Sequence, residues 1–436
     1  MTPARQTYPA RRTAWISAIV VFFIAAIATA DRMAIAMLIG PIKQEFRIGD
    51  FQASLLVGLA FTLFYILFLL PIGWAADRWS RRKVLAVCLV IWSLATAACG
   101  FAGGFISLFL LRMLVGAGEA GMAPCVHAVI GNSFPREALA KPLALQGIGF
   151  QVGGAAGVAA AGAVLAAGAS GTFADWPVLG GMAAWRIAFV LIGLPGLLAV
   201  LLVPLLYDRA QSEQPAAMPG ASLLPFLREH SVLVTLLLLN AGFSAVGLGA
   251  VTGWLPEFMQ RTLGMTPMAA GATMGSFLLL AAFAGQGGYS VLVDFFASRG
   301  MIDAPVRLGL VPTFLAIPLA WIAYQAATEA TFLPWLIAML LCLAPGNAIN
   351  NTVMQMIAPP ELRSRLVALM ILVISVIGFS GGPALVGWLS EYVVGEARLG
   401  LALQLVTTGS MAVTLVLLLL LRGRLVAFIE SRDVGA

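Results

Sequence analysis

The sequence predicts an all-α membrane protein that crosses the bilayer with twelve helices. The chain has 436 residues, of which 61% are hydrophobic and only 10% are charged, and its mean hydropathy is +0.98. Soluble domains carry about 25% charged residues, so a soluble fold would leave a large apolar surface in water. In a bilayer a helix satisfies its own backbone hydrogen bonds, and about 20 apolar residues span the hydrocarbon core. The composition therefore excludes an ordinary soluble protein.

Apolar runs of this length recur along the whole chain. The predicted spans cover residues 14–39, 51–76, 83–103, 105–132, 140–168, 185–207, 232–259, 266–296, 305–327, 331–357, 363–393 and 399–421. The first run is too long for the apolar region of a cleaved signal peptide, so we expect it to stay as a membrane helix.

The distribution of positive charge predicts the orientation. Most of the 25 Lys and Arg residues lie in the N-terminus, the even-numbered loops and the C-terminus. Because positive residues collect on the cytoplasmic side, both termini are expected in the cytoplasm. The net charge of +6 is thus a topology signal, and no nucleic-acid partner is expected. An excess of Arg over Lys, with abundant Ala and Gly, favours a GC-rich bacterial source and hence a multi-pass protein of the bacterial inner (plasma) membrane.

The chain divides into two halves that repeat each other. The longest polar gap between spans, residues 208–231, separates an N-terminal six-helix half (1–207) from a C-terminal six-helix half (232–436) and is expected to be a cytoplasmic linker. The segment PREALAKPLAL (135–145) aligns with PPELRSRLVAL (359–369), and the same offset places Gly154 on Gly378. Two pseudo-symmetric halves with a substrate site between them are typical of secondary transporters.

Four charged residues lie inside predicted spans of the first half. They are Asp31 and Arg32 in the first span, and Arg112 and Glu119 in the fourth. A charge at the bilayer centre costs about 2.5–3.5 kcal/mol on insertion scales, so such residues usually pair and mark a transport pathway or a proton relay. They are the predicted proton-coupling and substrate site.

Helix geometry predicts how these four charges are arranged. At 1.5 Å per residue, Asp31 lies about 25 Å from the cytoplasmic end of its helix and Arg112 about 10 Å from the outer end of its own, so the two can pair. Glu119 projects from the same face as Arg112, about 10 Å deeper. Arg32 points about 100° away from Asp31 and is expected to have another partner. Because desolvation disfavours a charged carboxylate, Asp31 or Glu119 would bind the proton, while Arg112 would hold the deprotonated form or a substrate anion. A static ion pair that only orders the bundle is the alternative.

The loop after the second span carries the clearest motif, GWAADRWSRRK (73–83). It resembles the Gly-x-Leu-Ala-Asp-Arg-x-Gly-Arg-Arg/Lys loop of the major facilitator superfamily, with Ser80 in place of the second glycine. The resemblance implies the major facilitator fold and a cytoplasmic gate that uses the motif's conserved positions. Those positions are Gly73, Asp77, Arg78, Arg81 and Arg82. The alternative is a positive-inside signal alone.

A second motif narrows the resemblance. Arg112 followed by Gly-x-Gly-Glu-Ala (116–120) and Pro124, together with the Asp31-Arg32 pair, resembles the Spinster-like branch of this superfamily. This resemblance implies a secondary active transporter working by alternating access. It also implies proton-linked movement of an amphipathic, lipid-like substrate of the lysophospholipid or sphingoid type. The anion–cation symporter branch shares an arginine near this place, so a proton-coupled symporter of small organic or sugar acids is the alternative.

The second half has no matching buried charges. Its candidates for the cavity wall are polar and uncharged: Asn240, Ser244, Asn347, Asn350 and Asn351. Glu257, late in the seventh span, is expected at the outer rim. An acidic–basic half facing a polar and apolar half would suit an amphipathic substrate.

The sequence lacks the residue patterns that other classes of function require. The four cysteines have no metal-ligand spacing, there are two histidines, and no phosphate-binding loop of the ATPase type occurs. We therefore expect no enzyme activity, no catalytic residues, no metal and no cofactor. The expected partners are the lipid bilayer, an amphipathic small-molecule or lipid substrate, and protons, and the chain is expected to be a monomer.

Overall fold

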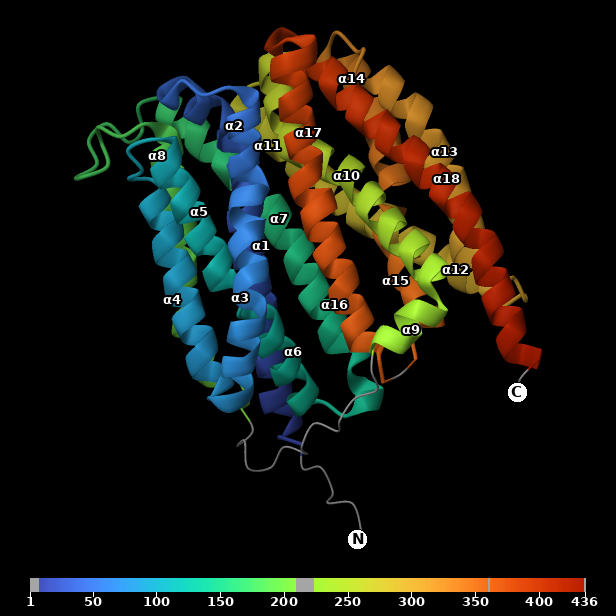
Figure 1. Ribbon diagram of the computed structural model, residues 1–436. Coiled ribbons are helices and arrows are strands. Elements are labelled where there is room, and N and C mark those ends of the chain that lie inside the picture. Colours follow the sequence, from blue (N-terminus) through green and yellow to red (C-terminus); the bar gives the residue numbers. More distant parts are fainter. Residues whose placement is uncertain (1–7, 209–222, 360, 435–436) are drawn as a thin grey trace. The chain divides into compact units, whose positions relative to one another are not determined.

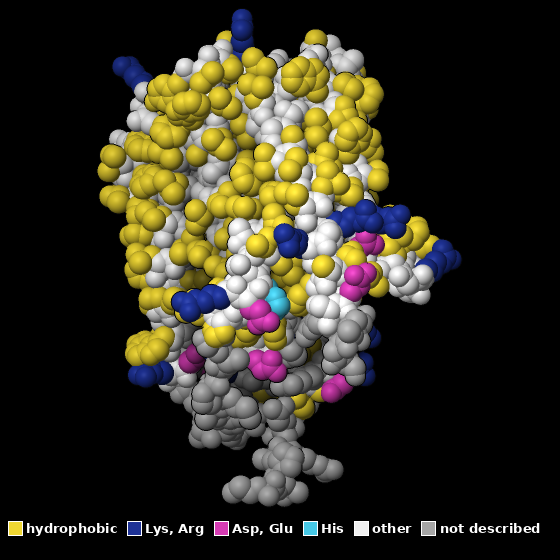
Figure 2. All heavy atoms as spheres, turned by 45° about the vertical axis from the view of Figure 1, so that its right-hand side comes forward, with side chains coloured by type: hydrophobic (Ala, Val, Ile, Leu, Met, Phe, Trp, Pro, Cys, Tyr) yellow, Lys and Arg dark blue, Asp and Glu magenta, His cyan; other side chains and the backbone are white. Residues whose placement is uncertain are grey.

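The structure, a computed structural model, describes residues 8–208, 223–359 and 361–434 (Figure 1). Twelve segments of these residues are helical, long enough and apolar enough to cross a membrane. Hydrophobic side chains dominate the face drawn in Figure 2, as lipid-facing helices require. The prediction of an all-α membrane protein with twelve spans is confirmed.

Several spans are built from more than one element. The first six spans are α1 (Arg11–Phe46), α2 (Asp50–Val57) with α3 (Leu59–Arg78), α4 (Arg81–Cys99), α5 (Phe105–Glu119) with α6 (Met122–Ser133), α7 (Ala140–Ala169), and α8 (Ala184–Val200) with η2 (Val203–Leu205). The next three are α10 (Ser231–Arg261), α11 (Pro267–Leu280) with η4 (Ala281–Gly287) and α12 (Gly288–Ala297), and α13 (Ala304–Ala323). The last three are α14 (Glu329–Leu343) with α15 (Pro345–Ile357), α16 (Arg363–Val373) with η5 (Ile374–Ser380), α17 (Gly381–Leu389) and η6 (Ser390–Val394), and α18 (Leu399–Val434). Short helices η1 (Arg136–Ala138) and α9 (Leu223–Glu229) lie between spans, and η7 (Glu396–Arg398) begins the last span.

The described residues pack into two compact units. The first unit takes its residues from Met1–Arg47, Ala60–Ala216 and Thr266–Gly275, and the second from Ile48–Leu59, Ala217–Met265 and Ser276–Ala436. The packed units differ from the sequence halves at two short segments: Ile48–Leu59 belongs to the second unit, and Thr266–Gly275 belongs to the first. Of the predicted linker, residues 209–222 lie outside the described residues, and α9 occupies its last part.

In the first unit α1 packs along α7 through small residues. A Cβ atom on Gly153 would overlap the backbone of Ala26, and one on Gly157 would overlap that of Ala30. The two glycines are one helical turn apart, so they form a small-xxx-small stripe that lets the helices approach closely. Because α7 fixes α1 along its length, the charged pair on α1 is held by a rigid element.

In the second unit α10 is the central helix and packs against α18 and α17. Leu237 of α10 shares a buried cluster with Leu418 and Leu421 of α18. Gly378 and Gly382 lie where a Cβ would overlap Ala245 and Val246 of α10. The neighbouring segment η5 is π-helical, and such turns locally distort a helix. Gly378 and Gly382 therefore serve close helix packing beside a distorted turn.

The segment α2 packs closely against α17 in the second unit because α17 has a glycine, Gly387, at the contact. A Cβ on Gly387 of α17 would lie 2.6 Å from the carbonyl oxygen of Asp50. Asp50 also accepts a hydrogen bond of 2.5 Å from Ser390. This contact explains why packing separates Ile48–Leu59 from the rest of the second span.

Candidate functional site

Asp31 and Arg112 form an ion pair inside the first unit, as the helix geometry predicts. Nη1 of Arg112, on α5, lies 3.3 Å from Oδ1 of Asp31, on α1, and the two side chains are 0% and 2% exposed. The hydroxyl of Thr96, on α4, donates a short hydrogen bond to the other carboxylate oxygen. Three helices therefore converge on the Asp31 carboxylate, and hydrogen bonds reach both of its oxygens.

Arg32 pairs with Glu119. Nη2 of Arg32 lies 2.5 Å from Oε2 of Glu119, and the Glu119 side chain is 1% exposed whereas Arg32 is 38% exposed. Sequence geometry predicted that Arg32 has a partner other than Asp31, and this is confirmed. Neighbouring residues on α1 thus point to different positions on α5, and all four predicted charges belong to one paired cluster.

Two aromatic rings of α3 cover the Arg32 guanidinium. Its Cζ lies 4.3 Å from the ring centroid of Phe61 and 5.7 Å from that of Tyr65. Cation–π attraction over such distances stabilises an arginine that the rings shield partly from solvent. Neither ring was predicted as part of the site. The available signal was their spacing of four residues, which places both rings on one helix face.

Several buried polar atoms in this cluster can form further hydrogen bonds. Among the described residues, Nε and Nη2 of Arg112 and Oε1 of Glu119 are buried without a hydrogen-bond partner. An unsatisfied buried polar group costs about 1–3 kcal/mol. The cluster can therefore accept an anionic group at Arg112 and a donor at Glu119.

The predicted cytoplasmic gate motif lies across the end of α3 and the start of α4. The Arg78 guanidinium stacks over the Trp74 ring at 4.2 Å, and Arg81 is buried at 8% exposed. Gly73 has open space where a Cβ would lie. Its presence in the motif therefore does not come from packing among the described residues.

Asp208, which sequence reasoning missed, caps the start of α4. Its Oδ2 accepts a hydrogen bond of 2.7 Å from the Ser80 hydroxyl and one of 3.5 Å from the backbone amide of Arg82. A carboxylate at a helix N-terminus is favoured by the helix dipole. Ser80, the departure from the family motif, is thus the residue that ties this loop to the end of the sixth span.

The polar candidates of the second unit divide into two groups. Nδ2 of Asn240 donates to Oδ1 of Asn350 at 2.7 Å, and Nδ2 of Asn350 donates to the Ser244 hydroxyl at 3.1 Å. These three residues form a buried network between α10 and α15. Asn351 is exposed and donates to the carbonyl oxygen of Asn347, so it lies outside that network.

Glu257 is buried, at 6% exposed, and is not a free carboxylate at a rim. Arg261, one turn later on α10, lies 2.8 Å from Glu257 and 2.9 Å from the fully buried Asp50. Sequence reasoning missed Asp50 and Arg261 because they are 211 residues apart. Among the described residues no group of three His, Cys, Asp or Glu side chains could hold a metal ion.

Comparison with known proteins matches this architecture. The Major Facilitator Superfamily pattern covers residues 21–383. An MFS-type efflux pump of Mycolicibacterium smegmatis is 27% identical over 90% of this chain and 89% of its own. Protein spinster of Drosophila melanogaster is 26% identical over 88% of this chain, which spans 63% of the fly protein. A hexuronate transporter of Bacillus subtilis is 27% identical over 54% of each chain.

A solved structure shows the same fold. The crystal structure of a bacterial homolog to human lysosomal transporter Spinster, in an inward-facing and unoccupied conformation, superposes with a TM-score of 0.80. It covers 97% of this chain and 98% of its own, at 23% sequence identity. The chain therefore belongs to the Major Facilitator Superfamily, a family of transporters, and within it resembles the Spinster proteins.

Proposed function

We propose that this protein is a secondary active transporter that works by alternating access and moves an amphipathic, lipid-like substrate in a proton-linked cycle. The observation that carries the proposal is the cluster of two ion pairs: Asp31–Arg112, in which both side chains are buried, and Arg32–Glu119, in which the carboxylate is buried. Ion pairs of this kind inside membrane helices are expensive and usually functional. We place the protein in the bacterial inner membrane as a monomer with both termini in the cytoplasm.

The pairing supports proton linkage. When Asp31 binds a proton, Arg112 is left buried without a counter-charge, and when Glu119 binds a proton, the partly exposed Arg32 loses its ion-pair partner. Removing one partner of a buried pair costs about 3–5 kcal/mol, which is enough to shift a two-state equilibrium by about two to almost four orders of magnitude. Protonation would therefore change which conformation is favoured, or make the arginine available to a substrate anion.

The difference in polar residues between the two units supports the proposed substrate class. Arg112 has two buried N–H groups without partners among the described residues, and arginine binds carboxylate and phosphate groups through such pairs of donors. The Asn240–Ser244–Asn350 network of the second unit is uncharged. An anionic or zwitterionic head group with an apolar tail fits this asymmetry. The Spinster-like resemblance favours a lysophospholipid or sphingoid-type lipid.

A proton-coupled symporter of small organic or sugar acids is the second candidate. The similarity to a hexuronate transporter favours it, and a single carboxylate would satisfy Arg112 equally well. The two candidates differ in the tail, because a sugar acid presents hydroxyl groups where a lipid presents methylene groups.

Transport in proteoliposomes tests both candidates. Lysophospholipids of increasing acyl length and a hexuronate would be compared, with and without an imposed pH gradient. We expect uptake that rises with acyl length and responds to the gradient. Saturable hexuronate uptake with no lysophospholipid transport would establish the alternative, and uptake unaffected by the gradient would refute the proton linkage.

Variants connect the activity to the cluster. Asp31→Asn, Arg112→Ala and Glu119→Gln should each abolish most transport, whereas Asp175→Asn, an exposed carboxylate in the loop before α8, should retain it. Wild-type rates for all three cluster variants would contradict the assignment of the site.

A further inference from the structure

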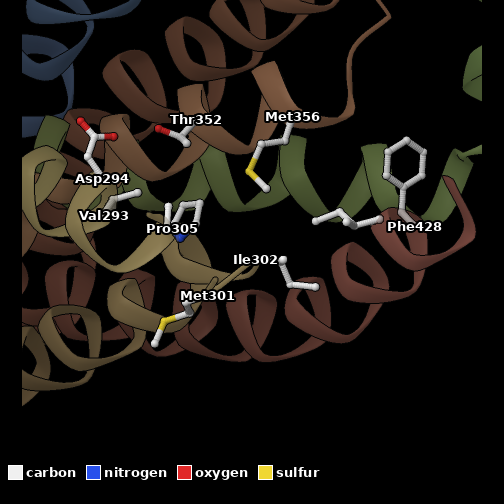
Figure 3. A pocket seen from close by; sticks show the side chains of 10 residues that line it. Val293, Asp294, Met301, Ile302, Pro305, Thr352, Met356 and Phe428 are labelled. Atoms are coloured by element: carbon white, nitrogen blue, oxygen red, sulfur yellow. The ribbon is translucent and has the colours of Figure 1, made fainter. Parts of the chain in front are cut away.

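The second unit contains a pocket that the transport proposal does not use. It has a volume of about 590 Å³ and lies between α12, α13, α15 and α18 (Figure 3). Pockets of about 300–1,000 Å³ are typical of small-molecule sites. Its apolar lining includes Met301, Ile302, Met356 and Phe428.

The polar groups of the pocket lie at one end. Figure 3 shows Asp294 and Thr352 together at one side and Phe428 at the other, with Met356 and Ile302 between them. Among the described residues, neither the Asp294 carboxylate nor the Thr352 hydroxyl has a hydrogen-bond or ion-pair partner. The pocket is therefore amphipathic along its length, with an anionic end and an apolar end.

Nearby arginines do not neutralise Asp294. Arg299 stacks on the Phe295 ring, with its Cζ 3.7 Å from the ring centroid. Arg422 lies 2.6 Å from Asp303 and pairs with that carboxylate. The charge of Asp294 is thus available to a cation from outside the chain.

We propose that this pocket binds an amphipathic organic cation. An ammonium head would contact the Asp294 carboxylate and the Thr352 hydroxyl, and an alkyl tail would run past Met356 towards Ile302 and Phe428. Thioether side chains adapt to apolar ligands of different shape, so the pocket selects for the charge of the head more than for the form of the tail. A neutral alcohol of equal length would lose the ion pair, and a fatty acid would be repelled.

Photolabelling of the full-length protein in phosphatidylcholine nanodiscs tests this site. The probe is dodecylamine with a photoreactive diazirine in its tail, and labelled peptides are mapped by mass spectrometry. We expect saturable labelling of peptides that contain Ile302, Met356 or Phe428. Unlabelled dodecylamine should compete, and dodecanol should compete less well. Labelling confined to other parts of the chain, or equal competition by dodecanol, would overturn the proposal.

Charge variants at the rim make the test specific. An exposed ion pair is worth up to about 1 kcal/mol, so Asp294→Asn should weaken the dodecylamine affinity about fivefold. Asp294→Lys should weaken it further and instead favour a photoreactive dodecanoic acid. Glu329→Gln, which removes an exposed carboxylate at the start of α14, is the matched control and should bind as the wild type does. Unchanged affinity in both Asp294 variants would refute the site. Because the readout is binding, this result does not depend on the transport activity.

Discussion

Arg261 holds Asp50 through two hydrogen bonds, from Nη1 to Oδ2 at 3.0 Å and from Nη2 to Oδ1 at 2.9 Å. Asp50 is completely buried and also accepts a hydrogen bond from Ser390. A paired fork of this kind is the strongest geometry available to an arginine and a carboxylate. It joins α2, α10 and η6 within the second unit, although α2 precedes most of the first unit in sequence.

Removal of Arg261 should destabilise the protein strongly. Arg261→Ala removes both hydrogen bonds that Arg261 donates to the buried Asp50 carboxylate, and breaking a buried pair in this way costs about 3–5 kcal/mol. Asp50→Asn should cost less, because Arg261 keeps Glu257 as a partner. Denaturant titration in detergent micelles measures both. Arg398→Ala, an exposed arginine on η7, is the control, and an equal effect at Arg398 would contradict this prediction.

The Asp31–Arg112 pair should behave as a coupled unit. Arg112→Met leaves a buried carboxylate and should lower the free energy of unfolding by about 3–5 kcal/mol. Adding Asp31→Asn removes the uncompensated charge, so the double variant should be more stable than the two single effects predict by about 0.5–3 kcal/mol. Additive effects within experimental error would show that the two side chains do not interact in the membrane protein.

Gly157 and Gly73 should respond differently to substitution. Gly157→Val places side-chain atoms against the α1 backbone at Ala30, and overpacking of this kind costs about 1–3 kcal/mol or more. Gly73→Ala adds a methyl group in open space, and Ala favours a helix, so stability should not fall. Thermal unfolding of the two variants side by side checks the contrast. A stable Gly157→Val protein would mean that α1 and α7 can separate freely.

The amide network of the second unit should depend on Asn350 and not on Asn351. Asn350→Ala leaves the buried amide of Asn240 without its partner, at about 1–3 kcal/mol, whereas the Ser244 hydroxyl still donates to the carbonyl oxygen of Ala241. Asn351→Ala changes an exposed side chain and should stay within about 0.5 kcal/mol of the wild type. The same denaturant titration distinguishes them, and the reverse order of effects would exclude the network.

Much of the fold was predictable because membrane insertion is a local property. A run of apolar residues crosses the bilayer whatever its neighbours are, so the twelve spans follow from composition and length. Small errors remain where a span is broken. The sequence gives no sign that the second span divides at Gly58 into α2 and α3, because the break comes from packing against Ser380 and Phe379.

The candidate site was predictable only in part. Helix rise alone placed Asp31 and Arg112 at a common height, since a straight helix converts residue number into depth. The contributions of Thr96, Phe61 and Tyr65 were missed. They are ordinary residues of apolar helices, and the four-residue spacing that places both rings on one helix face does not by itself distinguish a ring that covers an arginine from a ring that faces lipid.

The sequence by itself determined the membrane class, the twelve helices and the positions of the buried charges along them, because each follows from local hydropathy and from the fixed rise of a helix. Only the tertiary structure decided that Arg32 belongs to Glu119, that Asp50 belongs to Arg261, and that Asn350 but not Asn351 joins the amide network. These choices depend on the rotation of each helix about its axis and on how closely its neighbours approach. Glycine positions such as Gly157 and Gly387 set that approach through contacts between residues far apart in the chain.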